Sequence, residues 1–70
     1  MKVIDLHGAR YGDIYRLLED TCINGETPFE VVTGHSATMK KIVTEVIRGF
    51  DLYAREKLGN NGALVIYEKR

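Results

Sequence analysis

Asp5 and His7 are the first two side chains of this sequence that could do chemistry together. They stand two residues apart in an apolar segment, residues 2–7, that favours a β-strand, where alternation places both on one face. An imidazole beside a carboxylate can act as a general base, and the same pair could hold a divalent ion such as Mg²⁺. Gly8 follows directly and permits a sharp turn or the close approach of a ligand. The alternative interpretation is that His7 only fixes the turn after the strand.

A second candidate segment is Thr33-Gly34-His35-Ser36, which ends a predicted strand and leads into a predicted helix. Ser36 is typical of a helix N-cap. Lys40 and Lys41 fall in the first turn of that helix, where the helix dipole disfavours cations. An anion bound to the free backbone N–H groups near residues 34–37 would offset this repulsion, which predicts a phosphate site. The alternative is two solvated lysines on an exposed face.

A third candidate surface combines aromatic and cationic side chains near the C-terminus. Tyr53, Arg55 and Lys57 share one face of a predicted strand, and Tyr67 and Lys69 share a face of the next. If the two faces coincide on an uncovered side of the sheet, they can stack bases and bind phosphates. Ordinary alternation on half-buried strands is the other interpretation.

The elements that must position these residues follow from hydrophobic periodicity. Strands are predicted over residues 2–7, 29–33, 52–58 and 62–68, and helices over residues 11–24 and 37–49. Gly59-Asn60-Asn61-Gly62 is typical of a hairpin turn. The first strand–helix–strand unit favours parallel strands joined by a right-handed crossover, so the two motifs should meet at one sheet edge.

The predicted fold is a single two-layer α/β domain over residues 1–70, in the order β-α-β-α-β-β. We expect a four-stranded mixed sheet with two helices on one face and the other face open. Ile4 and Leu6 should face the helices, opposite Val3, Asp5 and His7. Two apolar stripes should complete the core. They comprise Ile14, Leu17, Leu18 and Cys22 on the first helix and Met39, Ile42, Val43, Val46, Ile47 and Phe50 on the second.

Composition and charge limit the class of protein. A chain of 70 residues with 44% hydrophobic residues indicates one folded domain. One cysteine allows no internal disulfide, and no apolar run is long enough to span a membrane, so we expect a cytoplasmic protein. Residues 1–35 carry three Lys and Arg against six Asp and Glu, and residues 36–70 carry seven against four. The net charge of zero argues against a purely electrostatic nucleic-acid binder but permits a local basic patch.

Three segments resemble a known family. Val3-Ile4-Asp5-Leu6-His7-Gly8 resembles the Leu-Asp-Leu-His-Gly signature that opens the Smr (small MutS-related) domain. Val31-Val32-Thr33-Gly34-His35-Ser36 is similar to that family's second motif, and Gly59-Asn60-Asn61-Gly62-Ala63-Leu64-Val65-Ile66 to its closing turn and last strand. The resemblance covers nearly the whole chain, and the predicted order of elements is also that of the family. Ser36 stands where the second glycine of a Gly-x-Gly motif is usual, and Met39-Lys40 where Leu-Arg is usual.

The resemblance implies binding to DNA or RNA and, in many members, nicking endonuclease activity. It places functional residues at Asp5, His7 and Gly8 and at Thr33 and Gly34. His7 would activate water or an attacking hydroxyl, while Asp5 would orient His7 or hold a metal ion. The phosphate contacts expected from the residues themselves add His35, Ser36, Lys40, Lys41 and Arg55. The alternative function is a non-catalytic nucleic-acid- or ribosome-associated binding module. Self-association, or a place in a larger complex, is left open by the sequence.

Overall fold

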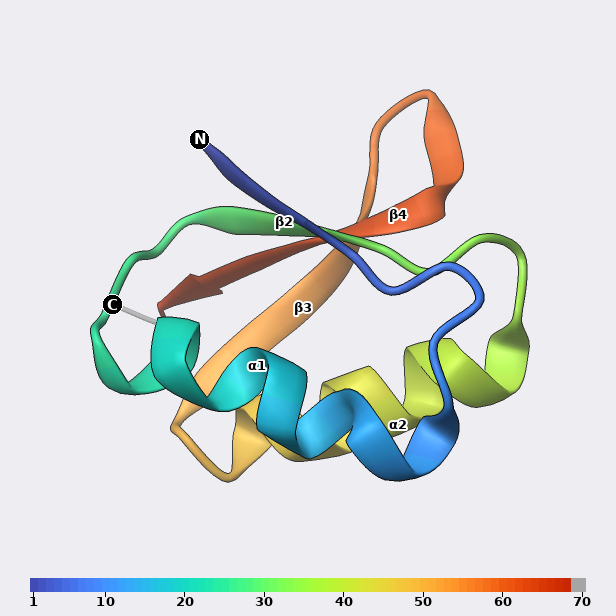
Figure 1. The fold of residues 1–70 in the computed structure, drawn as a ribbon. Helices are drawn as coiled ribbons and strands as arrows, with labels where there is room; N and C mark the ends of the chain where they lie inside the picture. Colours follow the sequence, from blue (N-terminus) through green and yellow to red (C-terminus); the bar gives the residue numbers. More distant parts are fainter. Residues whose placement is uncertain (69–70) are drawn as a thin grey trace.

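A four-stranded mixed sheet with two helices against one face makes up the fold, as the sequence predicts (Figure 1). The computed structural model describes residues 1–68. The strands lie in the order β1-β2-β4-β3; β1 is parallel to β2, and the other pairs are antiparallel. In chain order the elements are β1 (Lys2–Asp5), the 3-10 turn η1 (Tyr11–Asp13), α1 (Ile14–Ile23), β2 (Phe29–Val32), α2 (Ala37–Arg48), β3 (Leu52–Lys57) and β4 (Asn60–Glu68).

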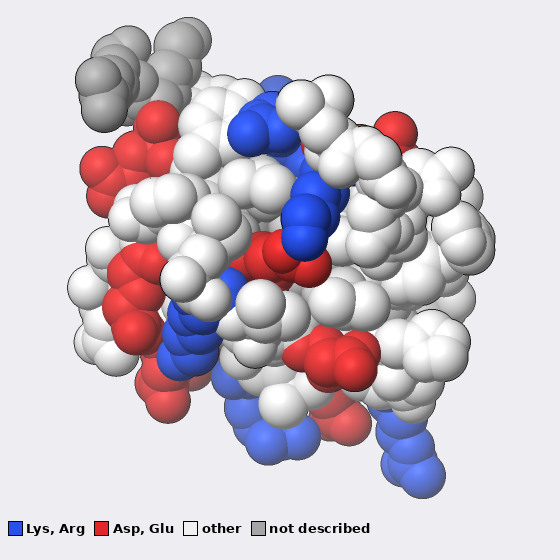
Figure 2. Space-filling view, turned by 90° about the horizontal axis from the view of Figure 1, so that it is seen from above, with Lys and Arg blue, Asp and Glu red and all other residues white. Residues whose placement is uncertain are grey.

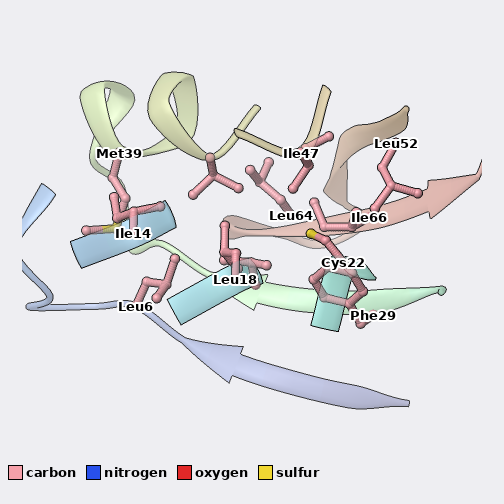
Figure 3. Close-up of a cluster of buried hydrophobic side chains, with 12 residues drawn as sticks. Leu6, Ile14, Leu18, Cys22, Phe29, Met39, Ile47, Leu52, Leu64 and Ile66 are labelled. Carbon is pink, nitrogen blue, oxygen red and sulfur yellow. The ribbon is translucent and has the colours of Figure 1, made fainter. Parts of the chain in front are cut away.

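The core lies between the sheet and the helices (Figure 3). Leu6 is 1% exposed and Ile4 is half-buried on the helix-facing side, whereas Val3 is exposed, which confirms the predicted alternation of β1. Cys22 is buried in this core as predicted, and burial raises the pKa of its thiol. The other members of this core cluster are Ile14, Leu18, Phe29, Val31, Met39, Val43, Ile47, Leu52, Leu64 and Ile66.

The first helix differs from the prediction in two respects. Its first turn is the separate 3-10 segment Tyr11–Asp13, and the α-helix begins at Ile14. Leu17, predicted in the buried stripe, is 40% exposed, while Thr21 is buried. Thr21 lies one turn beyond Leu18 on the line that faces the sheet, and Leu17 lies at the rim of that line. The helix therefore buries a narrower stripe than its apolar residues suggest.

The β3–β4 hairpin turns at Leu58-Gly59, not over residues 59–62 as predicted, because β4 already begins at Asn60. Glu56 pairs with Leu64, but Lys57 pairs with Asn60. The intervening β4 residues, Asn61 to Ala63, thus bulge out of the β3 ladder. This bulge brings Gly62 towards the loop that follows β2.

The face opposite the helices is open, as predicted. Tyr53 pairs with Tyr67 across β3 and β4, and their ring centroids lie 6.1 Å apart. Lys57 reaches across the sheet to Glu30 on β2, with Nζ and Oε1 2.8 Å apart. Figure 2 shows Lys and Arg side chains interspersed with Asp and Glu on this side, so residues 1–68 form no patch of a single sign there. Lys69, predicted to belong to this surface, lies outside the described residues.

No helix within residues 1–68 combines the length and the apolar composition that a membrane span requires.

Candidate functional site

The two motifs meet at one edge of the sheet, as predicted, because β1 and β2 are parallel neighbours. The parallel register runs from Lys2 opposite Phe29 to Asp5 opposite Val32. The Leu6 N–H then donates to the Val32 carbonyl at 2.8 Å, one step beyond the strand. The β1–α1 and β2–α2 loops therefore leave the sheet side by side, at the carboxyl ends of parallel strands where α/β sheets usually carry their sites.

Asp5 holds the turn that follows β1. The strand ends at Asp5, so His7 lies in the turn and not on the pleated strand that the sequence predicts. The Asp5 Oδ1 accepts a hydrogen bond from the His7 backbone N–H at 2.9 Å. Such a bond from an aspartate to the second residue after it competes with the strand ladder and ends the strand. Asp5 thereby fixes the backbone of His7, whereas the expected contact was with the imidazole ring.

Gly34 lies directly behind the His7 ring. Its φ is +66°, and a Cβ added there would lie 2.9 Å from the His7 Cδ2. Two features therefore favour glycine at position 34: the positive φ of the backbone and the close approach of the His7 ring. The Gly62 carbonyl of the β4 bulge accepts from both the Thr33 and the Gly34 N–H at 3.0 Å. The bulge thus fixes the surface against which His7 rests.

Ser36 caps α2 as predicted and also joins the two loops. Its Oγ accepts from the Met39 N–H at 3.1 Å. The same oxygen lies 3.3 Å from the Tyr11 hydroxyl, which belongs to the 3-10 turn after β1. This contact crosses from one loop to the other and positions the Tyr11 ring at the start of α2.

A hollow of about 650 Å³ opens between the two loops. Both histidines line it, one from each loop. Arg10 and Tyr11 line it as well, although sequence reasoning did not select them. The signal that could have found them is their place directly after His7-Gly8, in the loop that leaves the carboxyl end of β1. The lining residues are His7, Gly8, Ala9, Arg10, Tyr11, Thr33, His35, Ser36 and Met39.

The expected basic residues are not brought to this hollow. The Lys40 Nζ pairs with the Glu56 Oε2 at 2.7 Å and donates to the Asn61 carbonyl, and its side chain is 21% exposed. Lys40 therefore joins α2 to the β3–β4 hairpin. Lys41 is exposed on α2, and Arg55 is exposed on β3. Of the expected cations, none lines the hollow.

The donor atoms of the described residues do not form a metal-binding cluster. Within residues 1–68, no three His, Cys, Asp or Glu side chains gather closely enough to hold an ion. The Asp5 carboxylate is engaged by the His7 backbone N–H. The expectation that Asp5 and His7 hold a divalent ion therefore lacks the further protein ligands that such a site usually needs.

No protein-family model, no curated protein and no solved structure matches this chain. The resemblance described above thus rests on three short motifs and on the order of the elements.

Proposed function

We propose that this chain binds nucleic acid at the hollow and cleaves its phosphodiester backbone, as an endonuclease similar to the Smr family. One observation supports the proposal: the two loops bring His7 and His35 to the lining of one open hollow, which Arg10 lines as well. Cleavage of a phosphodiester requires proton transfer at the attacking and leaving oxygens. It also requires stabilisation of the negative charge that develops around phosphorus. The residues around the hollow can supply all three.

His7 is the candidate general base. Its backbone is held by Asp5, and its ring rests against Gly34, so its position is set from both sides. Its side chain is exposed and can accept a proton from water or from a ribose hydroxyl. His35 lies on the other loop and can return a proton to the departing oxygen. The attacking oxygen then forms the new P–O bond as the old one breaks.

Arg10 is the candidate phosphate ligand. Its guanidinium makes no hydrogen bond or ion pair with residues 1–68, and it lines the hollow with both histidines. An arginine can donate two parallel hydrogen bonds to a phosphate, which fixes orientation as well as charge. In this proposal Arg10 takes the role that the sequence suggested for Lys40, and the engagement of the Lys40 ammonium by Glu56 supports that change.

A binding module without turnover is the second candidate, and one observation favours it. The His7 ring makes no hydrogen bond to residues 1–68, and the Asp5 carboxylate is hydrogen-bonded to the His7 backbone and not to its ring. A catalytic imidazole is commonly held in one tautomer by a partner on its second nitrogen. Without such a partner the same surface can bind a strand and leave it intact.

The decisive experiment measures binding and cleavage on the same preparations. Supercoiled plasmid and an end-labelled structured RNA are incubated with the protein, with Mg²⁺ and with a chelator. We expect cleavage that His7→Gln lowers by about 10²- to 10⁴-fold, as the loss of a general base does. His35→Gln should lower it as well. Arg48→Gln, which changes an exposed side chain on α2 outside the hollow, is the control.

The outcomes separate the two candidates. Cleavage that survives His7→Gln at full rate contradicts the assignment of the base. Binding without any cleavage by the parent chain supports the binding module. If neither nucleic acid binds, the proposal is wrong. Circular dichroism and thermal melting of each variant check that the fold is retained.

A further inference from the structure

We infer that the hollow takes a single unpaired nucleotide, with its base against aromatic rings and its phosphate on Arg10. This inference rests on the proposed function and narrows its substrate class to strands that are unpaired at the bound position. Three features of the hollow carry it: its size, its ring side chains and its charge.

The hollow has the size of a small-ligand site. Its volume of about 650 Å³ falls in the range of roughly 300–1,000 Å³ that is usual for small-molecule and cofactor sites. It lies between two loops at the end of the sheet, and Met39, which is 4% exposed, forms part of its lining. A duplex presents its phosphates on the outside of a broad cylinder and cannot place a base in such a hollow without unpairing it.

Ring side chains make up much of its wall. Tyr11, His7 and His35 all line the hollow, and the Tyr11 side chain is half-exposed. Tyr11 is anchored through its hydroxyl to Ser36, and His7 is backed by Gly34. Rings held in this way lose little freedom when a base stacks on them. Stacking suits any base, because each has a π-face.

The charge around the hollow matches one phosphate. Among residues 1–68, Arg10 is the only Lys or Arg that lines it. Lys40, the phosphate ligand expected from the sequence, is paired with Glu56. A protein that follows duplex backbone must instead neutralise several phosphates. One cation beside three rings is the composition expected for one nucleotide.

The test compares paired and unpaired probes at matched sequence. Fluorescence anisotropy is measured with single-stranded DNA and RNA hexamers and with hairpin duplexes of the same bases. We expect the hexamers to bind at least about tenfold more tightly, and the affinity of a hexamer to fall with salt with a log–log slope near −0.7, as for one phosphate on a single strand. A preference for the DNA hexamer or for the RNA hexamer is compatible with the inference, and it identifies which nucleic acid the hollow binds.

Tyr11→Ala is the central variant, and Tyr15→Ala is its matched control. The two side chains are similarly exposed, Tyr11 by 50% and Tyr15 by 52%. Tyr15, however, packs against the ring of Phe50 and does not line the hollow. We expect Tyr11→Ala to weaken hexamer binding about tenfold, the usual cost of losing one stacked base. Tyr11→Phe should recover most of that loss, since it keeps the ring. Tyr15→Ala should change affinity less than about twofold, because it leaves the rings of the hollow intact.

The failures of the two proposals look different. If duplex and hexamer bind equally and Tyr11→Ala has no effect, while His7-dependent cleavage persists, the inference is overturned and the proposed function stands. If no polynucleotide binds, AMP is titrated against adenosine and inorganic phosphate and followed by NMR. Saturable AMP binding that Tyr11→Ala abolishes then supports a nucleotide site without nuclease activity. No AMP binding overturns both proposals.

Discussion

The hollow and the open face of the sheet carry similar residue types, but their charged groups are used differently. In the hollow, the side chains of Arg10 and His7 make no hydrogen bond or ion pair with residues 1–68. On the open face, Lys57 is committed to Glu30, whose side chain is 11% exposed. A cation can serve a ligand only where the fold has not already used it. Residue type alone therefore does not identify a binding surface.

Replacement of Gly34 tests whether the hollow depends on a close approach of His7. Gly34→Ala and the control Gly25→Ala both place a side chain at positive φ, near +66° and +67°. Each should lower the free energy of unfolding by about 1–2 kcal/mol, measured by urea denaturation. Only Gly34→Ala meets the His7 ring, whereas an added Cβ at Gly25 finds nothing within 4 Å. The imidazole NMR signals of His7 should therefore move in Gly34→Ala alone. Unmoved His7 signals there would contradict the packing.

Removal of Lys57 tests whether the open face is held by its own ion pair. Lys57→Met leaves the Glu30 carboxylate without its partner and should cost about 1 kcal/mol of unfolding free energy. Lys2→Met is the matched control, because Lys2 and Glu26 are both more than 40% exposed and 3.4 Å apart. That exposed pair should contribute less than about 0.5 kcal/mol. Equal losses in the two variants would mean that the Lys57 pair is an ordinary surface contact.

A pair of arginine variants tests whether single-stranded nucleic acid binds at the hollow or on the open face of the sheet. Arg10→Ala should weaken binding of a single-stranded hexamer about fivefold, which corresponds to about 1 kcal/mol. Arg55→Ala, on the open face, removes the same charge and should weaken it less than about twofold. Anisotropy titrations at one fixed salt concentration give both values. The reverse ranking would move the interface to the open face beside Tyr53 and Tyr67.

The smallest effect concerns the core beneath both regions. Burial raises the pKa of Cys22 above its usual value of 9.0, so the unfolded chain releases this proton at lower pH than the folded chain does. Titration of Cys22 should therefore leave the free energy of unfolding unchanged at neutral pH and lower it as pH rises above about 9. Cys22→Ala should lack this component when melts are compared from pH 7 to pH 10. Identical pH profiles would show that the thiol titrates normally.

The order of elements, the parallel crossover and the buried faces could be predicted because periodicity and strand connection rules act locally. Leu17 could not be assigned correctly, because its exposure depends on how far the sheet extends beneath α1. The shortened β1 depends on a hydrogen bond from Asp5 that competes with strand pairing. Likewise, the engagement of Lys40 requires Glu56 and Asn61, which the hairpin brings from far along the chain.

The candidate site residues likewise divide into those that the local sequence pattern predicts and those that depend on the three-dimensional fold. His7, Gly8, Thr33, His35 and Ser36 line the hollow, since they follow the ends of two neighbouring strands. Arg10 and Tyr11 lie beyond the short motif that ends at Gly8, so the motif does not identify them. Their place in the lining of the hollow depends on the path of the loop after β1, which the sequence does not determine by itself.

The place of β4 in the sheet has a consequence for how the protein assembles. It is the last of the four strands in the chain, yet it lies inside the sheet between β2 and β3. Its Gly62 also supplies the carbonyl that holds Thr33 and Gly34. During synthesis, β1, β2 and β3 therefore emerge from the ribosome without the strand that joins them. The sheet and the hollow should therefore form together, in one cooperative step after β4 has been synthesised. A nascent chain that lacks β4 should not contain the formed hollow.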